Sequence, residues 1–350
     1  MKLWRIGNAV ALALLALLPA RALYAHVKWF SEFDFAHPPR PVQELLTPLF
    51  WALLILSMVV MAVLVPVDGW LAAHPWIQRM EAWLTRHKAN STTIMRAATA
   101  ATLLLAWNND ALLVPELPIT APLLGWLQFA LVLLLCLRWS TPLAGVGLLA
   151  LYGYGVATHG IFYMLDYLHF VGVALYLILS NVDELRWRAI RLPVLYATVG
   201  FALIWLALEK LVYPDWGLYV LQHNPQMALG LPPTFFLPSA AFVEIGLGYL
   251  LLIGLMSRPL SVVITLVFFS TTLIFGKTEI IGHTVLHAAL IVFLLNGAGT
   301  VYRPPISFHQ NLRLRMAFAA INYVLVLALL LALYQYSAWQ QYNLLAISPN

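Results

Sequence analysis

The 350-residue chain is a series of long apolar runs separated by short polar breaks. A helix that crosses a hydrocarbon core of about 30 Å needs about 20 apolar residues. The pattern therefore predicts an all-α, polytopic membrane bundle of about ten transmembrane helices, with no soluble domain. We expect the spans at roughly 45–65, 96–115, 122–137, 142–162, 166–181, 194–213, 238–256, 259–276, 283–298 and 317–336.

The residues before the first span are typical of a secretory signal. Lys2 and Arg5 precede an apolar stretch, and the small residue Ala25 follows it. We expect residues 1–25 to be a signal peptide whose cleavage leaves His26 as the new N-terminus. An uncleaved signal anchor is the alternative. Ten spans after a cleaved signal put both mature termini on the periplasmic side of a bacterial inner membrane.

The positive charges support this orientation, because basic residues gather on the cytoplasmic side of membrane proteins. The expected outer segments of the mature chain contain only four, Lys28, Arg40, Lys210 and Lys277. The expected cytoplasmic segments contain twelve: Arg79, Arg86, Lys88, Arg96, Arg138, Arg186, Arg188, Arg191, Arg258, Arg303, Arg313 and Arg315. Most histidines and carboxylates fall on the outer side, so we expect the chemistry there.

The composition fits a protein surrounded by lipid. Hydrophobic residues make up 62% of the chain and charged residues 9%, against about 25% charged residues in soluble domains. The net charge of +5 comes from basic residues scattered singly between apolar runs, so it does not indicate nucleic acid. Glycine-rich phosphate-binding motifs are absent from the sequence, and a single cysteine excludes a C-x-x-C pair.

The middle of the chain contains a weak internal repeat. Leu123–Asn181 resembles Phe242–Asn296, with Gln128 opposite Glu244, Pro142 opposite Pro259 and His169 opposite His287. The repeat predicts two parallel four-helix units, a pattern known in transporters. We expect the following order: a periplasmic segment at 26–44; the first span and a cytoplasmic amphipathic segment at 45–93; the units at 94–182 and 190–300; and a cytoplasmic loop, last span and periplasmic tail at 301–350.

Three stretches of the second unit resemble the DoxX family of four-helix membrane proteins. They are Glu209-Lys210 with Pro214-Asp215-Trp216; Glu244 in a Gly-rich helix that closes at Ser257-Arg258-Pro259; and FGKTEIIGH before the fourth helix. The resemblance covers about 190–300, and the first unit looks like a degenerate copy. The resemblance implies a role in quinone-linked oxidation of sulfur compounds or in a membrane redox-defence complex.

The sharpest candidate site is Glu279, His283 and His287, spaced i, i+4, i+8 on one side of a helix. Ionisable groups at membrane depth indicate function. Two imidazoles and a carboxylate suit Zn, Cu or Fe, and they equally suit proton relay beside a quinone. The alternative is hydrogen bonding that joins helices. Glu209 and Lys210 are expected at the same mouth, which completes the candidate catalytic set.

The first unit and the mature N-terminus offer further candidates. Asp166 and His169 are neighbours at i, i+3 and are candidate cofactor ligands, and a haem held by one histidine from each unit is conceivable. The amine and imidazole of His26 would chelate Cu(II). The candidate metal ligands are therefore His26, His159, His283 and His287. The alternatives are histidines bonded to neighbouring helices, and an N-terminal segment that lies on the bilayer or plugs the outer mouth.

The leading functional hypothesis is a quinone-linked redox protein with a periplasm-facing His/carboxylate site. One alternative is a periplasmic copper binder or transporter. Another is a non-catalytic membrane anchor for a periplasmic redox partner. The expected partners are the lipid bilayer and a quinone or small periplasmic substrate. Whether the protein is an enzyme is left open by the sequence.

Overall fold

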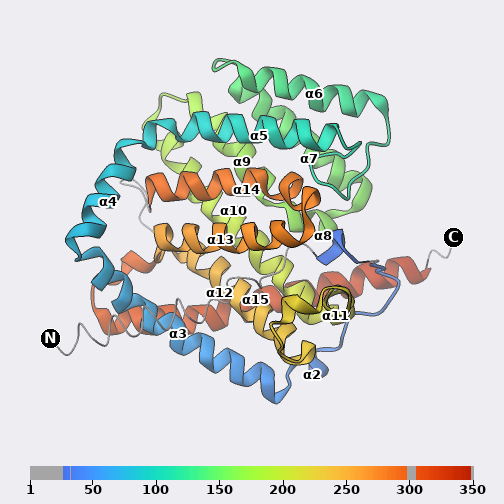
Figure 1. The fold of residues 1–350 in the computed structure, drawn as a ribbon, viewed down its shortest axis with the longest axis vertical. Helices are drawn as coiled ribbons and strands as arrows, with labels where there is room; N and C mark the ends of the chain where they lie inside the picture. The colour runs from blue at the N-terminus through green and yellow to red at the C-terminus, as the bar shows by residue number, and fades with distance from the viewer. Residues whose placement is uncertain (1–26, 32, 298–304, 348–350) are drawn as a thin grey trace.

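The computed structural model describes residues 27–31, 33–297 and 305–347, which form helices and no strand (Figure 1). The predicted signal peptide 1–25 and His26 lie outside these residues. The helices are η1 (Val27–Trp29), α2 (Val42–Leu45), α3 (Pro48–Ala72), α4 (Pro75–Arg86), η2 (Lys88–Asn90), α5 (Ser91–Trp107), α6 (Pro122–Cys136), α7 (Thr141–His159), α8 (Ile161–Met164), η3 (Leu165–Tyr167), α9 (His169–Ile178), η4 (Leu179–Asn181), α10 (Leu185–Val212), α11 (Pro214–His223), η5 (Pro225–Ala228), α12 (Pro233–Ile253), α13 (Ser257–Phe275), α14 (Lys277–Asn296), η6 (Pro305–Phe308) and α15 (Leu312–Ile347).

Every predicted span overlaps a helix. Within the described residues, seven helices are long and apolar enough to cross a membrane, and α8–η3 with α9 makes an eighth if this bent pair crosses as one. Helices α6, of 15 residues, and α5, of 17 residues, are short for a hydrocarbon core of about 30 Å. The all-α membrane bundle is therefore confirmed, whereas the number of ten crossings stays a prediction.

The helices pack as two similar sets of four. In the first set α5 packs on α6 and α7 on α9; in the second, α10 packs on α12 and α13 on α14. The sets meet where the first helix of each packs on the last helix of the other, α5 on α14 and α9 on α10. Helices α3 and α15 pack together beside the second set (Figure 1). Two tandem units would pack in this way, but the repeat itself stays a prediction.

Helices α10 and α12 approach closely because glycines face each other. A Cβ atom added to Gly200 would lie 2.7 Å from the carbonyl oxygen of Gly248, and one added to Gly248 would lie 2.6 Å from that of Gly200. Small residues allow such backbone approach between membrane helices, where van der Waals packing drives association. This close packing fixes the two helices that carry Glu209, Lys210 and Glu244.

The loop after α5 corrects the predicted span 96–115. The helix ends at Trp107, and Asp110 takes a left-handed conformation with φ of 53°, which Asp tolerates better than most residues. The following residues, including Leu113, stay buried but irregular, and Gln128 accepts a hydrogen bond from the Leu113 N–H at 3.0 Å. Irregular backbone is tolerated at such depth only when protein groups satisfy it. Apolar residues thus formed a buried loop here, not a helix.

The predicted spans 142–162 and 166–181 meet at a break. Helix α7 ends at His159 and is followed by Gly160, whose φ of +83° favours glycine. The pair formed by α8–η3 and α9 then bends by 64°. Asp166 and His169 lie on either side of this bend, and both are buried. The bend therefore places two ionisable side chains inside the bundle.

The bundle has two distinct ends. At one end α4 lies across helix ends, on the left of Figure 1, and Arg258 Nη2 donates to Thr85 Oγ1 at 2.7 Å. Asn296 Nδ2 also donates to Ser91 Oγ there, at 2.8 Å. At the other end, on the right, lie η1, α8 and α11. We call this second end the plug end.

Candidate functional site

The N-terminal segment, residues 27–31 and 33–35, inserts into the bundle at the plug end. The Trp29 ring packs so tightly on Gly282 of α14 that a Cβ atom there would overlap it. Phe30 stacks on Phe275, with ring centroids 3.9 Å apart. Trp29 Nε1 also donates a hydrogen bond to the Tyr167 hydroxyl at 3.1 Å. These contacts bury the segment among the helix ends, and its role as a plug of the outer mouth stays a prediction.

Insertion of this segment buries a lysine among carboxylates. Lys28 is only 4% exposed, and its Nζ lies 2.5 Å from Asp166 Oδ2 and 2.8 Å from Glu209 Oε2. Glu116, from the loop after α5, accepts a hydrogen bond from the Tyr167 hydroxyl. Burial by itself would lower the pKa of Lys28, but the negative charges of the three acids outweigh it and raise that pKa. We call Lys28, Glu116, Asp166 and Glu209 the charged cluster.

The adjacent residues Glu209 and Lys210 face different partners. Glu209 belongs to the charged cluster, whereas Lys210 Nζ donates to Glu244 Oε2 at 2.7 Å. Lys210 and Glu244 are 3% and 7% exposed. Each charge is thus neutralised by another element, because neighbours on a helix point about 100° apart.

The predicted triad on α14 faces α13, but only two of its members meet. Glu279 Oε2 lies 2.8 Å from His283 Nδ1 and accepts a hydrogen bond from Thr271 Oγ1 at 2.7 Å. The His283 ring stacks on Phe268, with centroids 4.2 Å apart and planes 3° apart. His287 packs instead against Phe269, with ring centroids 4.8 Å apart. The i, i+4 pair is therefore one unit and His287 is a neighbour.

The remaining predicted ligands are dispersed. His169 is buried, neither ring nitrogen has a hydrogen-bond partner among the described residues, and it lies close enough to His283 to interact electrostatically. His159 is half-buried and packs on Tyr163, with ring centroids 5.6 Å apart. Asp166 is bound to Lys28. Over the described residues, no group of three or more His, Cys, Asp or Glu is arranged to hold a metal ion.

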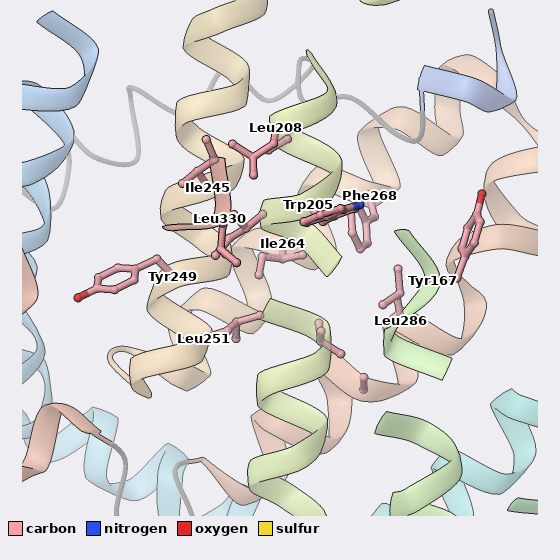
Figure 2. Close-up of a cluster of buried hydrophobic side chains, with 14 of the residues drawn as sticks. Tyr167, Trp205, Leu208, Ile245, Tyr249, Leu251, Ile264, Phe268, Leu286 and Leu330 are labelled. Carbon is pink, nitrogen blue, oxygen red and sulfur yellow. The ribbon is translucent and has the colours of Figure 1, made fainter. Parts of the chain in front are cut away.

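A small cavity between α10, α12, α13 and α14 is shared by the Lys210–Glu244 pair and by His283 of the Glu279–His283 pair. It has a volume of about 30 Å³ and is lined by Lys210, Glu244 and His283 together with apolar side chains. Figure 2 shows Phe268, Ile264 and Leu286, which line it, among the buried apolar side chains. The prediction that Lys210 and His283 lie at one mouth agrees with this geometry. Glu209 lies outside it.

A groove of about 1060 Å³ opens at the plug end. It is lined by eight residues between Phe33 and Glu44, by the α10–α11 junction and Tyr219, and by Trp339 of α15. Its floor is aromatic, since Tyr213 stacks on Trp216 with centroids 4.3 Å apart and Phe35 packs on both. The other side of this floor faces the charged cluster, because Lys28 Nζ lies 5.3 Å from the Phe35 ring centroid. We call it the plug-end groove.

Sequence reasoning missed Lys28 and Glu116 as members of the site. Both were counted only as charges on the outer side. A signal existed for Glu116, a lone acid within the apolar stretch LLVPELP, because an isolated charge in such a stretch needs a buried partner. For Lys28 the sequence has no comparable signal, since its partners come from two distant helices.

Comparison with known proteins supports the family resemblance. Residues 197–277 match the DoxX family model, from α10 to the first residue of α14. No curated protein and no solved structure matches the chain. The match includes Lys210 and Glu244 and eight of the ten residues that line the cavity. With seven helices of membrane-spanning length among the described residues, the chain is a multi-pass membrane protein that contains a DoxX-like segment at 197–277.

Proposed function

We propose that this protein is a quinone-linked redox protein of a bacterial inner membrane, with its quinone site at the cavity between α10, α12, α13 and α14. One observation carries the proposal. Lys210, Glu244 and His283 converge on a cavity whose other walls are apolar. Ligand sites combine apolar walls with a few convergent polar groups in this way.

The polar groups suit the chemistry of a quinone. Reduction of a quinone to a quinol takes up two electrons and two protons. The Lys210 ammonium would donate a hydrogen bond and then its proton to one quinone carbonyl oxygen, and the His283–Glu279 pair would supply the second proton to the other oxygen; both donors would be reprotonated from water. The electrons would come from a periplasmic reductant, either a reduced redox protein or a small reduced compound. His287 and His169 would lie in the shell around this site.

The cavity has to widen to admit a quinone ring. A volume of about 30 Å³ accommodates one or two water molecules. Leu203, Leu206 and Val267 in its walls are half-buried, so the cavity lies close to the outer surface of the bundle, where lipid would surround it. Helices α12 and α13 pack on each other less than on α10 and α14. We expect the ring to enter by separating these two helices.

The test is the quinone that the protein retains. We expect organic extraction of gently purified protein to release close to one quinone per chain. His283→Ala should lower this ratio, and Leu206→Trp should lower it without changing any polar group, by filling the mouth. His223→Ala, at an exposed histidine, is the matched control. Wild-type protein without quinone, or variants that retain it fully, would refute the proposal.

A further inference from the structure

We propose that the charged cluster is a proton-binding site that exchanges its proton with the plug-end groove. The charges of the cluster do not balance. The cluster contains three carboxyl groups and one ammonium, so full ionisation would leave two negative charges in excess. An unpaired buried charge costs several kcal/mol. Binding of one proton between neighbouring carboxylates removes one of these two charges and lowers the cost, as in other sites where acids share one position.

Free hydrogen-bonding atoms surround the cluster. Asp166 Oδ1 and Glu209 Oε1 are buried without a hydrogen-bond partner among the described residues. So are the hydroxyls of Tyr213 and Tyr334, which are 4% and 0% exposed. Tyr334 interacts electrostatically with both Glu209 and Asp166. Free acceptors therefore face free hydroxyls, which is the set that a proton and a bridging water would satisfy.

The groups that face the cluster come from every neighbouring element. Besides Lys28 of η1 they are tyrosines: Tyr152 of α7, Tyr163 of α8, Tyr167 of η3, Tyr213 after α10 and Tyr334 of α15. Lys28 already contacts Asp166 and Glu209, so it has no capacity to neutralise Glu116 as well. Burial raises the pKa of Glu116, although the charge of Lys28 acts in the opposite direction. This direction favours the protonated form of the Glu116 carboxyl group.

Tyr213 connects the cluster to the outside. Its ring lines the plug-end groove, and its hydroxyl interacts with Lys28 and Glu209. The rings of Phe35 and Trp216 pack on Tyr213, so the Tyr213 hydroxyl is a polar group within an aromatic barrier. A proton would pass from the cluster to the groove through this hydroxyl. A role of this proton in the quinone reaction rests on the proposed function, whereas binding of the proton to the cluster can be measured without quinone.

The experiment is infrared spectroscopy of the full-length protein in nanodiscs at neutral pH. We expect a carbonyl stretch of a protonated carboxylic acid that shifts in D₂O. It should be lost or reduced in at least one of Glu116→Gln, Asp166→Asn and Glu209→Gln, and retained in Asp215→Asn, which removes an exposed carboxylate of the groove. Absence of the band, or its persistence in all three cluster variants, would overturn the proposal.

Tyr213→Phe tests the route separately, since it keeps all three carboxyl groups. The band should remain while its shift in D₂O becomes slower than in the wild type. An unchanged rate of exchange would overturn the route through Tyr213. Because neither measurement uses quinone, failure of the quinone extraction and failure of the proton site are distinguishable.

Discussion

Replacing Lys28 by methionine removes the only ammonium of the charged cluster and keeps a chain of similar length. At an effective dielectric constant of about 20, an ion pair at 2.8 Å is worth roughly 6 kcal/mol before desolvation is counted. Removal of one partner of a buried pair costs about 3–5 kcal/mol in practice. A typical domain is stable by about 5–15 kcal/mol. We therefore expect Lys28→Met to lose a large part of the free energy of unfolding.

The stranded carboxylates supply a second signature. Without the Lys28 ammonium, these carboxylates can become neutral by binding protons, so the variant should be destabilised less at acidic pH than at alkaline pH. Thermal unfolding in detergent, followed by circular dichroism across a pH series, measures both effects. Lys277→Met removes an exposed lysine as the control, and Glu209→Gln added to Lys28→Met should restore part of the stability. A Lys28→Met protein that unfolds like the Lys277→Met control at every pH would refute the reasoning.

Three further predictions concern the plug, the loop acid and the metal question. Gly282→Ala should displace the Trp29 ring and cost about 1–3 kcal/mol in thermal unfolding, whereas Gly153→Ala, with open space around it, should not destabilise. Folding raises the pKa of Glu116, so its proton contributes to the free energy of unfolding at low pH. This contribution is lost as the pH rises through the raised pKa. Glu116→Gln should therefore make the thermal stability depend less on pH in the same assay. A triple variant replaces Glu279, His283 and His287 by alanine. Elemental analysis should find the same metal content in this variant and in the wild type. Near-stoichiometric metal in the wild type that is lost in the variant would favour the metal-binding alternative.

The sequence predicted the helices well because apolar runs of membrane length have few alternatives. In lipid the backbone must satisfy its own hydrogen bonds, which leaves a helix for nearly every such run. The run at 96–115 was the exception, since its last residues form a buried loop. There the Leu113 N–H donates to the Gln128 side chain and not to a helix carbonyl. The residues of the run by themselves do not indicate that a side chain outside the run would accept this hydrogen bond. The DoxX resemblance was also readable in advance from Glu209-Lys210 and Glu244, which lie within the matched residues 197–277.

Pairing of the charges was decided by the tertiary structure. The i, i+4 spacing predicted that Glu279 and His283 meet, because helix geometry alone fixes that distance. No local rule joins Lys28 to Asp166 and Glu209, which lie 138 and 181 residues further along the chain. Their contact depends on how η1 inserts beside η3 and α10, and side-chain packing between helices determines that insertion. The sequence thus determined which ionisable residues the bundle must bury, and the packing of distant helices decided which of them form ion pairs with one another.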